Sequence, residues 1–214
     1  MVSLQHDQNT LSSGNESVRI KLPEPVYDST TSIEKALMNR RSIRDYRDEP
    51  LTLAEVSQLL WAAQGITDPE GYRTAPSAGA LYPLELSVVT GNVIDLKKGI
   101  YRYIPQKHEL IMSMEGDVRN KLSGAALEQS CVRNGAVIFV FSAVYNRTTR
   151  RYGERGIQYV HMEAGHAAQN ICRQAVSLHL GTVVIGAFHD NDVKKIMNMG
   201  DNEQPLYLLP VGRR

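Results

Sequence analysis

The chain has 214 residues, which is enough for one domain with a substantial core. Apolar residues make up 42% and charged residues 22%, ordinary proportions for a globular protein. The 24 basic and 23 acidic side chains leave a formal net charge of +1, so no overall field favours nucleic acid or an anionic membrane. Any anion site would therefore have to be local.

Three features of the sequence bear on the cellular compartment of the protein. No apolar run approaches the roughly 20 residues that a membrane span needs, so we expect no membrane segment. Residues 1–20 are polar without a secretory pattern, which predicts a flexible lead-in to a single domain over residues 21–214. Cys131 and Cys172 lack metal-type spacing and a partner base, so we expect buried, unreactive thiols in a reducing, cytoplasmic environment.

Two capping boxes predict helices in the first third of the chain. Thr31–Glu34 precedes a short apolar face, and Thr52–Glu55 opens a longer helix that ends at Gly65. Between them lies Arg40–Arg44, which holds three arginines and a serine. Guanidinium groups fit phosphate oxygens two at a time and stay charged, so this segment is a candidate phosphate site. A solvated basic surface is the alternative.

The next segment, Gly71–Ala80, is a loop of small residues with a rigid turn. Such a loop lets a backbone approach a flat ligand, although an ordinary surface turn has the same composition. Strands are predicted over 84–90 and 100–104, and a helix over 117–130. Residues 135–144 are almost continuously apolar, which predicts a strand covered on both faces.

The last third contains the longest predicted helix. A polar connection over 150–155 leads into this helix, which spans roughly 156–180. A buried strand over 182–187, a short helix capped by Asp190, and an apolar strand over 206–211 follow. Strands and helices do not alternate regularly, so we expect an α+β fold with a mixed central sheet rather than a doubly wound parallel one.

Several common chemistries have no support in the sequence. There is no dinucleotide-binding Gly-x-Gly-x-x-Gly after a strand, no Walker lysine loop and no Gly-x-Ser-x-Gly elbow. His161 and His166 are five residues apart on the long helix, so they favour structural roles over a shared metal site, and we expect no metal. Glu163 could orient an arginine or pair with a base, although a partner on a neighbouring helix is the commoner role.

Five motifs occurring in order resemble the FMN-dependent nitroreductase family. The similarity is greatest to its SagB-type branch, which includes the azoline dehydrogenases of thiazole and oxazole peptide synthesis, and it covers about 22–214. The motifs are Arg40–Arg44, Ala75–Pro83, Tyr152–Gly156, Glu163–Asn170 and Val184–Phe188.

The resemblance implies a homodimeric α+β fold with a long central helix and two FMN molecules at the interface, each touched by both subunits. The FMN phosphate, ribityl chain and pyrimidine edge would be held by Arg40, Arg41, Ser42 and Arg44. The partner subunit would line the flavin ring with Pro76, Ser77, Ala78 and Gly79. The ring would also meet backbone atoms of Ile185 and Gly186, and Arg213, together with Arg214, would close on the phosphate.

Two positions depart from the family pattern. Many nitroreductases carry an asparagine where this chain has Ala80, which puts one ring hydrogen bond in doubt. Azoline-oxidising members carry a Lys-Tyr pair before the long helix, whereas this chain has Arg151 and Tyr152. Tyr152 can donate or relay a proton, but arginine cannot replace lysine as a base. A ring packed at a helix start is the alternative for Tyr152.

Four functions are weighed on this basis. The leading hypothesis is an FMN-dependent oxidoreductase in which NAD(P)H reduces the flavin and a small acceptor, such as a nitro compound or quinone, then takes the electrons. A SagB-type dehydrogenase would instead oxidise an azoline or other C–N bond, with oxygen as acceptor. A non-catalytic flavin-binding subunit is the third. A nucleic-acid binder is disfavoured by the near-zero net charge.

Overall fold

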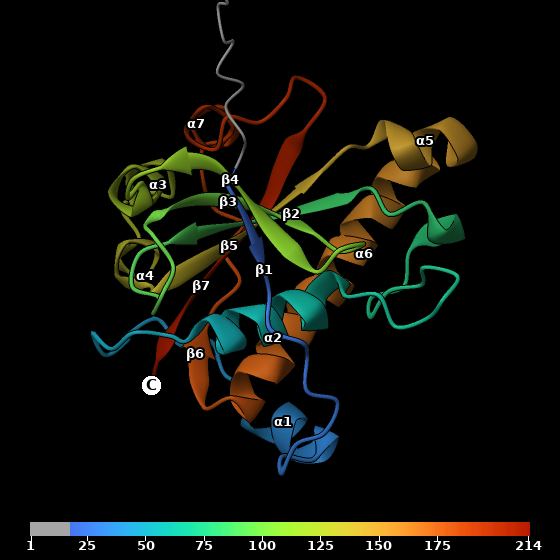
Figure 1. Ribbon diagram of the computed structural model, residues 1–214. Helices are drawn as coiled ribbons and strands as arrows, with labels where there is room; N and C mark the ends of the chain where they lie inside the picture. The colour runs from blue at the N-terminus through green and yellow to red at the C-terminus, as the bar shows by residue number, and fades with distance from the viewer. Residues whose placement is uncertain (1–17) are drawn as a thin grey trace, which may run out of the picture.

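The computed structural model describes residues 18–214, which form a central sheet between two layers of helices (Figure 1). The seven strands lie in the order β1-β4-β3-β2-β5-β7-β6, and all six ladders are antiparallel. Within the described residues, parallel pairing is confined to the isolated bridge Leu51–Val93. The strands are β1 (Arg19–Lys21), β2 (Leu84–Thr90), β3 (Gly99–Ile104), β4 (Glu109–Glu115), β5 (Val137–Ala143), β6 (Leu180–Thr182) and β7 (Gln204–Arg213).

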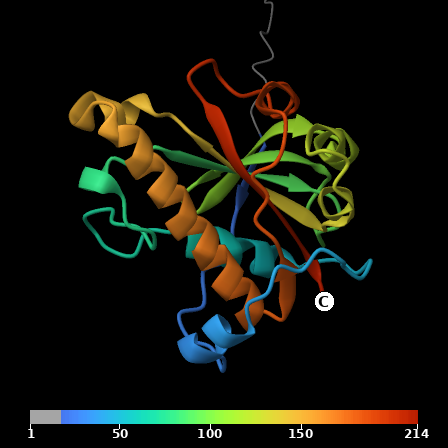
Figure 2. The same ribbon diagram turned by 180° about the vertical axis from the view of Figure 1, so that it is seen from behind.

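Helices α2 and α6 cover one face of the sheet, and α3, α4 and α7 cover the other (Figures 1 and 2). Strand β5 shows why both layers are needed: Phe139 and Phe141 belong to the first core cluster, whereas Ile138 and Val140 belong to the second. The helices are α1 (Ile33–Asn39), α2 (Leu53–Gln64), the 3₁₀ turn η1 (Ala78–Ala80), α3 (Arg119–Ala125), α4 (Ser130–Asn134), α5 (Asn146–Tyr152), α6 (Arg155–Ser177) and α7 (Asp190–Ile196).

The predicted α+β class and long helix are confirmed, as is the second capping box. The Thr52 side chain accepts from the Glu55 N–H at 3.2 Å, and the Glu55 carboxylate accepts from the Thr52 N–H at 2.8 Å. These reciprocal bonds satisfy backbone donors that a helix start leaves free, so α2 begins at Leu53. We predicted a core stripe of Leu53, Val56, Leu59, Leu60 and Ala63 on this helix; the last four are fully buried, and Leu53 is partly buried.

The first capping box is wrong by one position. Ser32, rather than Thr31, caps α1, because the Ser32 hydroxyl accepts from the Lys35 N–H at 3.2 Å. The cap of α7 is one residue earlier than predicted, at His189 instead of Asp190, and the His189 side chain makes no cap hydrogen bond. The predicted helix over 117–130 is two short helices, α3 and α4.

Further corrections concern strands and the connection before α6. Strands β1 and β4 were not predicted, and β1 begins at Arg19, within the predicted lead-in, whose residues 1–17 lie outside the described residues. The 150–155 connection is largely helix α5. The strand predicted over 182–187 is wrong: β6 ends at Thr182, and only Ile185 makes an isolated bridge beyond it.

Candidate functional site

The arginine-rich segment after α1 is fixed along the edge of the sheet. The Ile43 N–H donates to the Thr182 carbonyl of β6 at 2.9 Å, and the Tyr46 hydroxyl donates to the Ile43 and Pro210 carbonyls at 2.9 and 3.1 Å. Gly181 permits this contact, since a Cβ there would lie 2.7 Å from the Ile43 side chain. The backbone of Arg40–Arg44 is therefore rigidly placed.

The three arginines of this segment differ in their contacts. Arg41 folds back onto the end of α1, where its guanidinium donates to the Met38 and Arg40 carbonyls at 2.9 and 2.7 Å. Arg40 is half-buried and Arg44 is exposed, and neither forms an ion pair with another residue of the 18–214 portion. Ser42 is exposed between them. Arg40 and Arg44 are the guanidinium groups best able to bind an anion.

The Arg213 guanidinium is bonded to other residues of the chain, and its contact with a phosphate stays a prediction. Two of its guanidinium nitrogens bind the Glu55 carboxylate at 2.5 and 2.9 Å, and the third donates to the Pro50 carbonyl at 3.2 Å. This bidentate pair joins the end of β7 to the capping box of α2. The Cγ atom of Arg214 lies, like the Ile43 side chain, in the space beside Gly181.

The small-residue loop is a tight turn with an unusual backbone. Gly79, Ala80 and Tyr82 have φ values of 62°, 53° and 46°. For residues other than glycine this left-handed conformation costs about 1–2 kcal/mol each, so neighbouring contacts must hold the turn. One such contact is the Tyr82 N–H, which donates to the Ser77 hydroxyl at 2.9 Å.

The two predicted catalytic residues, Arg151 and Tyr152, lie against this loop. A Cβ on Gly79 would be 2.8 Å from the Tyr152 hydroxyl and 2.9 Å from a guanidinium nitrogen of Arg151, so a side chain at this left-handed position would have to displace these two groups. The Tyr152 ring meets Tyr159 edge-on at 5.2 Å between centroids. The structure thus brings Tyr152, Arg151 and Gly79 together at one surface, with Pro76, Ser77 and Ala78 in the same turn.

The Ile185–Gly186 pair lies beside β7. Ile185 is buried, and its N–H and carbonyl are both bonded to Leu208 at 2.9 Å. Its backbone N–H and carbonyl are therefore already hydrogen-bonded within the protein, and its approach to a flavin ring stays a prediction. Gly186 is exposed, with the Tyr207 ring as the nearest group to a Cβ, at 3.7 Å.

The two halves of the predicted site are far apart within one chain. Helix α5 and η1 lie at the N-terminal end of α6, whereas α1 and β6 lie at its C-terminal end (Figures 1 and 2). Helix α6 has 23 residues, which corresponds to about 35 Å. A ligand that contacts both the arginine segment and the Gly79 turn therefore requires a second copy of the chain.

The chain exposes apolar side chains that such a copy would cover. Those on α1 and α6 are Ile33, Leu37, Met38, Ile157 and Met162, which are 54%, 47%, 68%, 43% and 51% exposed. On α6, Gly165 has no atom within 4 Å of the position of a Cβ. Exposed apolar faces on two adjacent helices are typical of a protein–protein interface.

Glu163 is a buried carboxyl group near the Gly79 turn. It is 2% exposed, and burial raises its pKa to about 7, against opposing effects of a hydrogen bond from Ser77 and the charge of Arg73. Its Oε1 atom has no hydrogen-bond partner among residues 18–214. Arg73 also donates to Gln64 at 2.7 Å and stacks over Tyr82 at 4.2 Å. Among residues 18–214 no ion pair or hydrogen bond joins Glu163 to Arg73, so the role of Glu163 stays a prediction.

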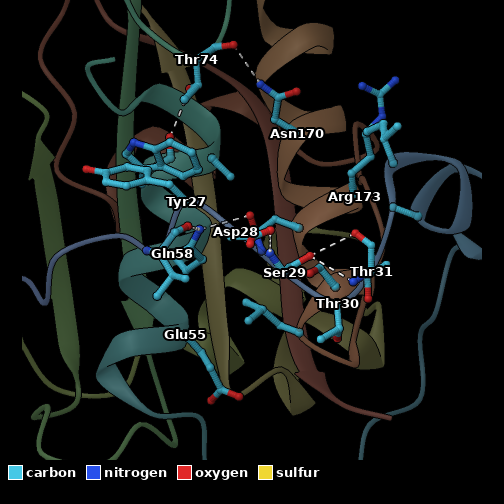
Figure 3. A pocket seen from close by; sticks show the side chains of 18 of the residues that line it. Tyr27, Asp28, Ser29, Thr30, Thr31, Glu55, Gln58, Thr74, Asn170 and Arg173 are labelled. Carbon is cyan, nitrogen blue, oxygen red and sulfur yellow. Dashed lines mark hydrogen bonds between the residues drawn. The ribbon is translucent and has the colours of Figure 1, made fainter. Parts of the chain in front are cut away.

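A cavity that none of the predicted site residues lines is shown in Figure 3. It has a volume of about 820 Å³ and lies between segment 26–36 and helices α2 and α6. Tyr27 and Trp61 meet edge-on at 5.4 Å on one side, and Arg173 lies on the other. No motif or spacing in the sequence indicates this cavity.

Cysteines and histidines do not form a reactive centre here. Cys131 and Cys172 are buried free thiols, as predicted, and burial raises the pKa of both, that of Cys172 to about 11. His161 is bonded to the Tyr145 hydroxyl at 2.6 Å, which fits the structural role predicted for it. Within residues 18–214 no three His, Cys, Asp or Glu side chains are grouped as metal ligands, and no helix is long and apolar enough to cross a membrane.

The comparisons with known proteins establish the family. The model of the nitroreductase family matches residues 37–213. A protein of Methanocaldococcus jannaschii described as a nitroreductase is 44% identical over 199 residues, which are 93% of this chain and 98% of that protein. The chain therefore belongs to the nitroreductase family, and this membership supports an oxidoreductase activity.

Other relatives are more distant. The trifolitoxin operon protein TfxC of Rhizobium leguminosarum is 29% identical over 82% of this chain, which spans about half (54%) of that relative. A crystal structure of a Ralstonia eutropha protein described as a nitroreductase has a TM-score of 0.82 and 29% identity, covering 94% of this chain and 91% of that one. The NADPH:FMN oxidoreductase of Vibrio harveyi, complexed with NAD+, shares the fold at 20% identity and a TM-score of 0.62, covering 85% and 68%.

Proposed function

We propose that this protein is an FMN-dependent oxidoreductase that takes a hydride from NAD(P)H and passes it to a small acceptor such as a nitro compound or a quinone. The observation that carries the proposal is the pair Arg40 and Arg44, which form no ion pair within residues 18–214 and lie on a backbone fixed to the sheet. Guanidinium groups without a carboxylate partner are well suited to bind a phosphate dianion. Family membership and the cofactor named for the Vibrio harveyi protein agree with FMN.

The proposed flavin lies between two copies of the chain. The phosphate end would be held by Arg40, Ser42 and Arg44, with Arg214, and Arg41 would brace that segment through the end of α1. The partner copy would line the ring with its own Pro76–Gly79 turn, because this turn is at the opposite end of α6. The exposed apolar faces of α1 and α6 support such a homodimer.

The residues of this chain would orient the flavin ring and supply a proton to the acceptor. When bound, FMN would supply the hydride acceptance and delivery that no side chain can perform. Gly79 and Gly186 would leave room for a flat ring, since neither projects a side chain. The Tyr152 hydroxyl, beside Gly79, would donate a proton to the reduced acceptor, and Arg151 would stabilise negative charge there.

The test is the visible absorption spectrum of the purified protein before and after anaerobic addition of NADH or NADPH. Flavin bands that bleach on addition are the expected result. Bands that persist with both nicotinamides would favour a substrate-oxidising or non-catalytic protein, and a protein that stays colourless after incubation with FMN would refute the proposal.

Replacing Tyr152 by phenylalanine should slow acceptor reduction about 10- to 100-fold, because the proton donor is lost while the ring remains. Flavin content and the rate of flavin reduction by the nicotinamide should not change. Stopped-flow measurement of the two half-reactions separates these steps. Equal rates of acceptor reduction in both proteins would assign Tyr152 a packing role through its contact with Tyr159.

A second candidate is a SagB-type dehydrogenase that oxidises a C–N bond in a peptide or small molecule. The similarity to the trifolitoxin operon protein favours it, whereas Arg151, at the position of the family's lysine, argues against it. Turnover with oxygen and an azoline substrate, without a nicotinamide, would support this candidate over the first.

The proposal also includes a single flavin-binding domain over residues 21–214 and a reducing, cytoplasmic setting. The family match over most of this range supports the domain, and the two buried free thiols support the setting.

A further inference from the structure

A second cavity lies between the loop that carries the Gly79 turn, the end of α2, and strands β2 and β3. Its volume is about 360 Å³, within the range of about 300–1,000 Å³ that is usual for small-molecule sites. The lining combines apolar side chains, among them Leu86 and Ile104, with the polar side chains of Gln64 and Arg73. None of the residues proposed to contact the flavin lines it, so this cavity is separate from the proposed flavin site.

Gln64 and Arg73 bond to each other in a way that leaves donors of both unused. The Nη1 of Arg73 donates to the Oε1 of Gln64 at 2.7 Å, and since a guanidinium can only donate, this bond identifies the oxygen end of the amide. The Nε2 of Gln64, a residue 1% exposed, and the Nε of Arg73 are buried without a hydrogen-bond partner in the part of the chain that the structure describes. Buried donors normally have partners, so two unpaired donors in residues that line one cavity indicate a missing acceptor.

Arg73 is also a half-buried charge that forms no ion pair with another residue between positions 18 and 214. Glu85 lines the same cavity, but it is paired with Arg147 and, at 3.2 Å, with Arg102. Glu163 attracts Arg73 through space without an ion pair. Burial lowers the pKa of Arg73, which is the direction expected for a cation that has lost water without gaining a carboxylate partner. The missing acceptor should therefore be an anion.

We propose that this cavity is a binding site for a small carboxylic acid with an apolar body, whose carboxylate accepts hydrogen bonds from Arg73 and Gln64. The bond to Gln64 occupies Nη1 and leaves the Nε–Nη2 edge of the planar guanidinium, which matches the two oxygens of a carboxylate. One unbalanced positive charge suits a monoanion, and the apolar side chains of the cavity would contact the rest of the ligand. The inference does not depend on the proposed flavin chemistry.

The test is a titration with benzoate, followed by the side-chain signals of Gln64 Nε2 and Arg73 Nε in ¹H–¹⁵N NMR spectra of the full-length protein, with and without FMN. The two sets of signals are assigned by their loss in Gln64→Glu and Arg73→Lys. Benzamide, which has the same ring and no charge, is the matched neutral compound. We expect both signals to shift saturably with benzoate, whether or not FMN is present, and to stay in place with benzamide.

Gln64→Glu is also the most informative variant for affinity. Glutamate has the shape of glutamine and places a carboxylate of the protein itself beside Arg73, so the variant should fold and should bind benzoate more than about tenfold more weakly, as read from the Arg73 Nε signal. The control is Arg133→Gln, which removes an exposed arginine of α4 and should change the benzoate dissociation constant by less than about twofold.

Each contrary outcome has a distinct meaning. Signals that do not move with benzoate would show that water alone meets these donors, and would overturn the inference. Equal shifts with benzamide, or an unchanged benzoate affinity in Gln64→Glu, would overturn it as well. Binding that FMN abolishes would place benzoate in the flavin site and would also overturn it. A protein that never binds FMN would refute the proposed function and leave the titration without FMN to judge this inference.

Discussion

Replacing Arg44 by alanine should weaken FMN binding by roughly 30- to 150-fold, since the charge-assisted hydrogen bonds of one guanidinium contribute about 2–3 kcal/mol. Arg44 makes no ion pair with another described residue, so its loss should leave the protein fold intact. Titration of FMN-free protein with FMN, followed by flavin fluorescence, gives the dissociation constants. Thermal unfolding without FMN confirms that both proteins are folded.

The matched control is Arg47→Ala, three residues along the same segment. Arg47 is exposed and its guanidinium pairs with Glu49 at 3.2 Å, so its removal should change FMN affinity by less than about threefold. Equal affinity in Arg44→Ala and native protein would show that the phosphate is bound elsewhere. Equal losses in both variants would indicate general electrostatic attraction rather than a defined contact.

Replacing Glu163 by glutamine should raise the unfolding free energy above that of the native protein by more at pH 8 than at pH 5. The pKa of Glu163 is about 7 in the folded protein and near 4.5 in the unfolded chain. Between these values the folded state holds a proton that the unfolded state has released, so native stability falls as pH rises from about 4.5 to about 7 and is constant beyond. Over this pH range the unfolding free energy of the native protein should fall by about 3 kcal/mol.

Glutamine keeps the shape of the side chain but does not titrate. The difference in unfolding free energy between Glu163→Gln and native protein, measured by urea denaturation, should therefore grow by up to about 3 kcal/mol between pH 5 and pH 8. Glu70→Gln, at an exposed loop position, is the control and should show the same small difference at both pH values. A pH-independent difference for Glu163→Gln would show that Glu163 is not protonated in the folded state near neutral pH.

Local signals in the sequence predicted the elements that depend on local chemistry. The Thr52–Glu55 capping box and the apolar stripe of α2 were located correctly because each is complete within one or two helical turns. Strand β4 was missed because its residues 109–115 mix charged and apolar side chains without a clean alternation. Helix α5 was missed because its five polar and basic residues after Asn146 look like a connection.

The candidate site was only partly predictable, because several of its contacts join residues that are far apart in the sequence. The contact of Gly79 with Tyr152 joins residues that the sequence marked separately, but their adjacency depends on the packing of α5. The Arg213–Glu55 pair spans 158 positions, so no local pattern could indicate that Arg213 has a carboxylate partner. Segment 182–187 is apolar enough for a strand, yet Val184 is exposed and the chain leaves β7 after one bridge at Ile185.

The attachment of the arginine segment to β6 and β7 has a consequence for synthesis of the protein. Residues 40–47 emerge from the ribosome early, but their supports, Thr182, Pro210 and Arg213, are made last. Contacts over such distances cannot form on a growing chain, whatever the order in which helices appear. The arginine segment is therefore held in its final place only after β7 has been made, and, if the proposed function is correct, FMN would bind after that point.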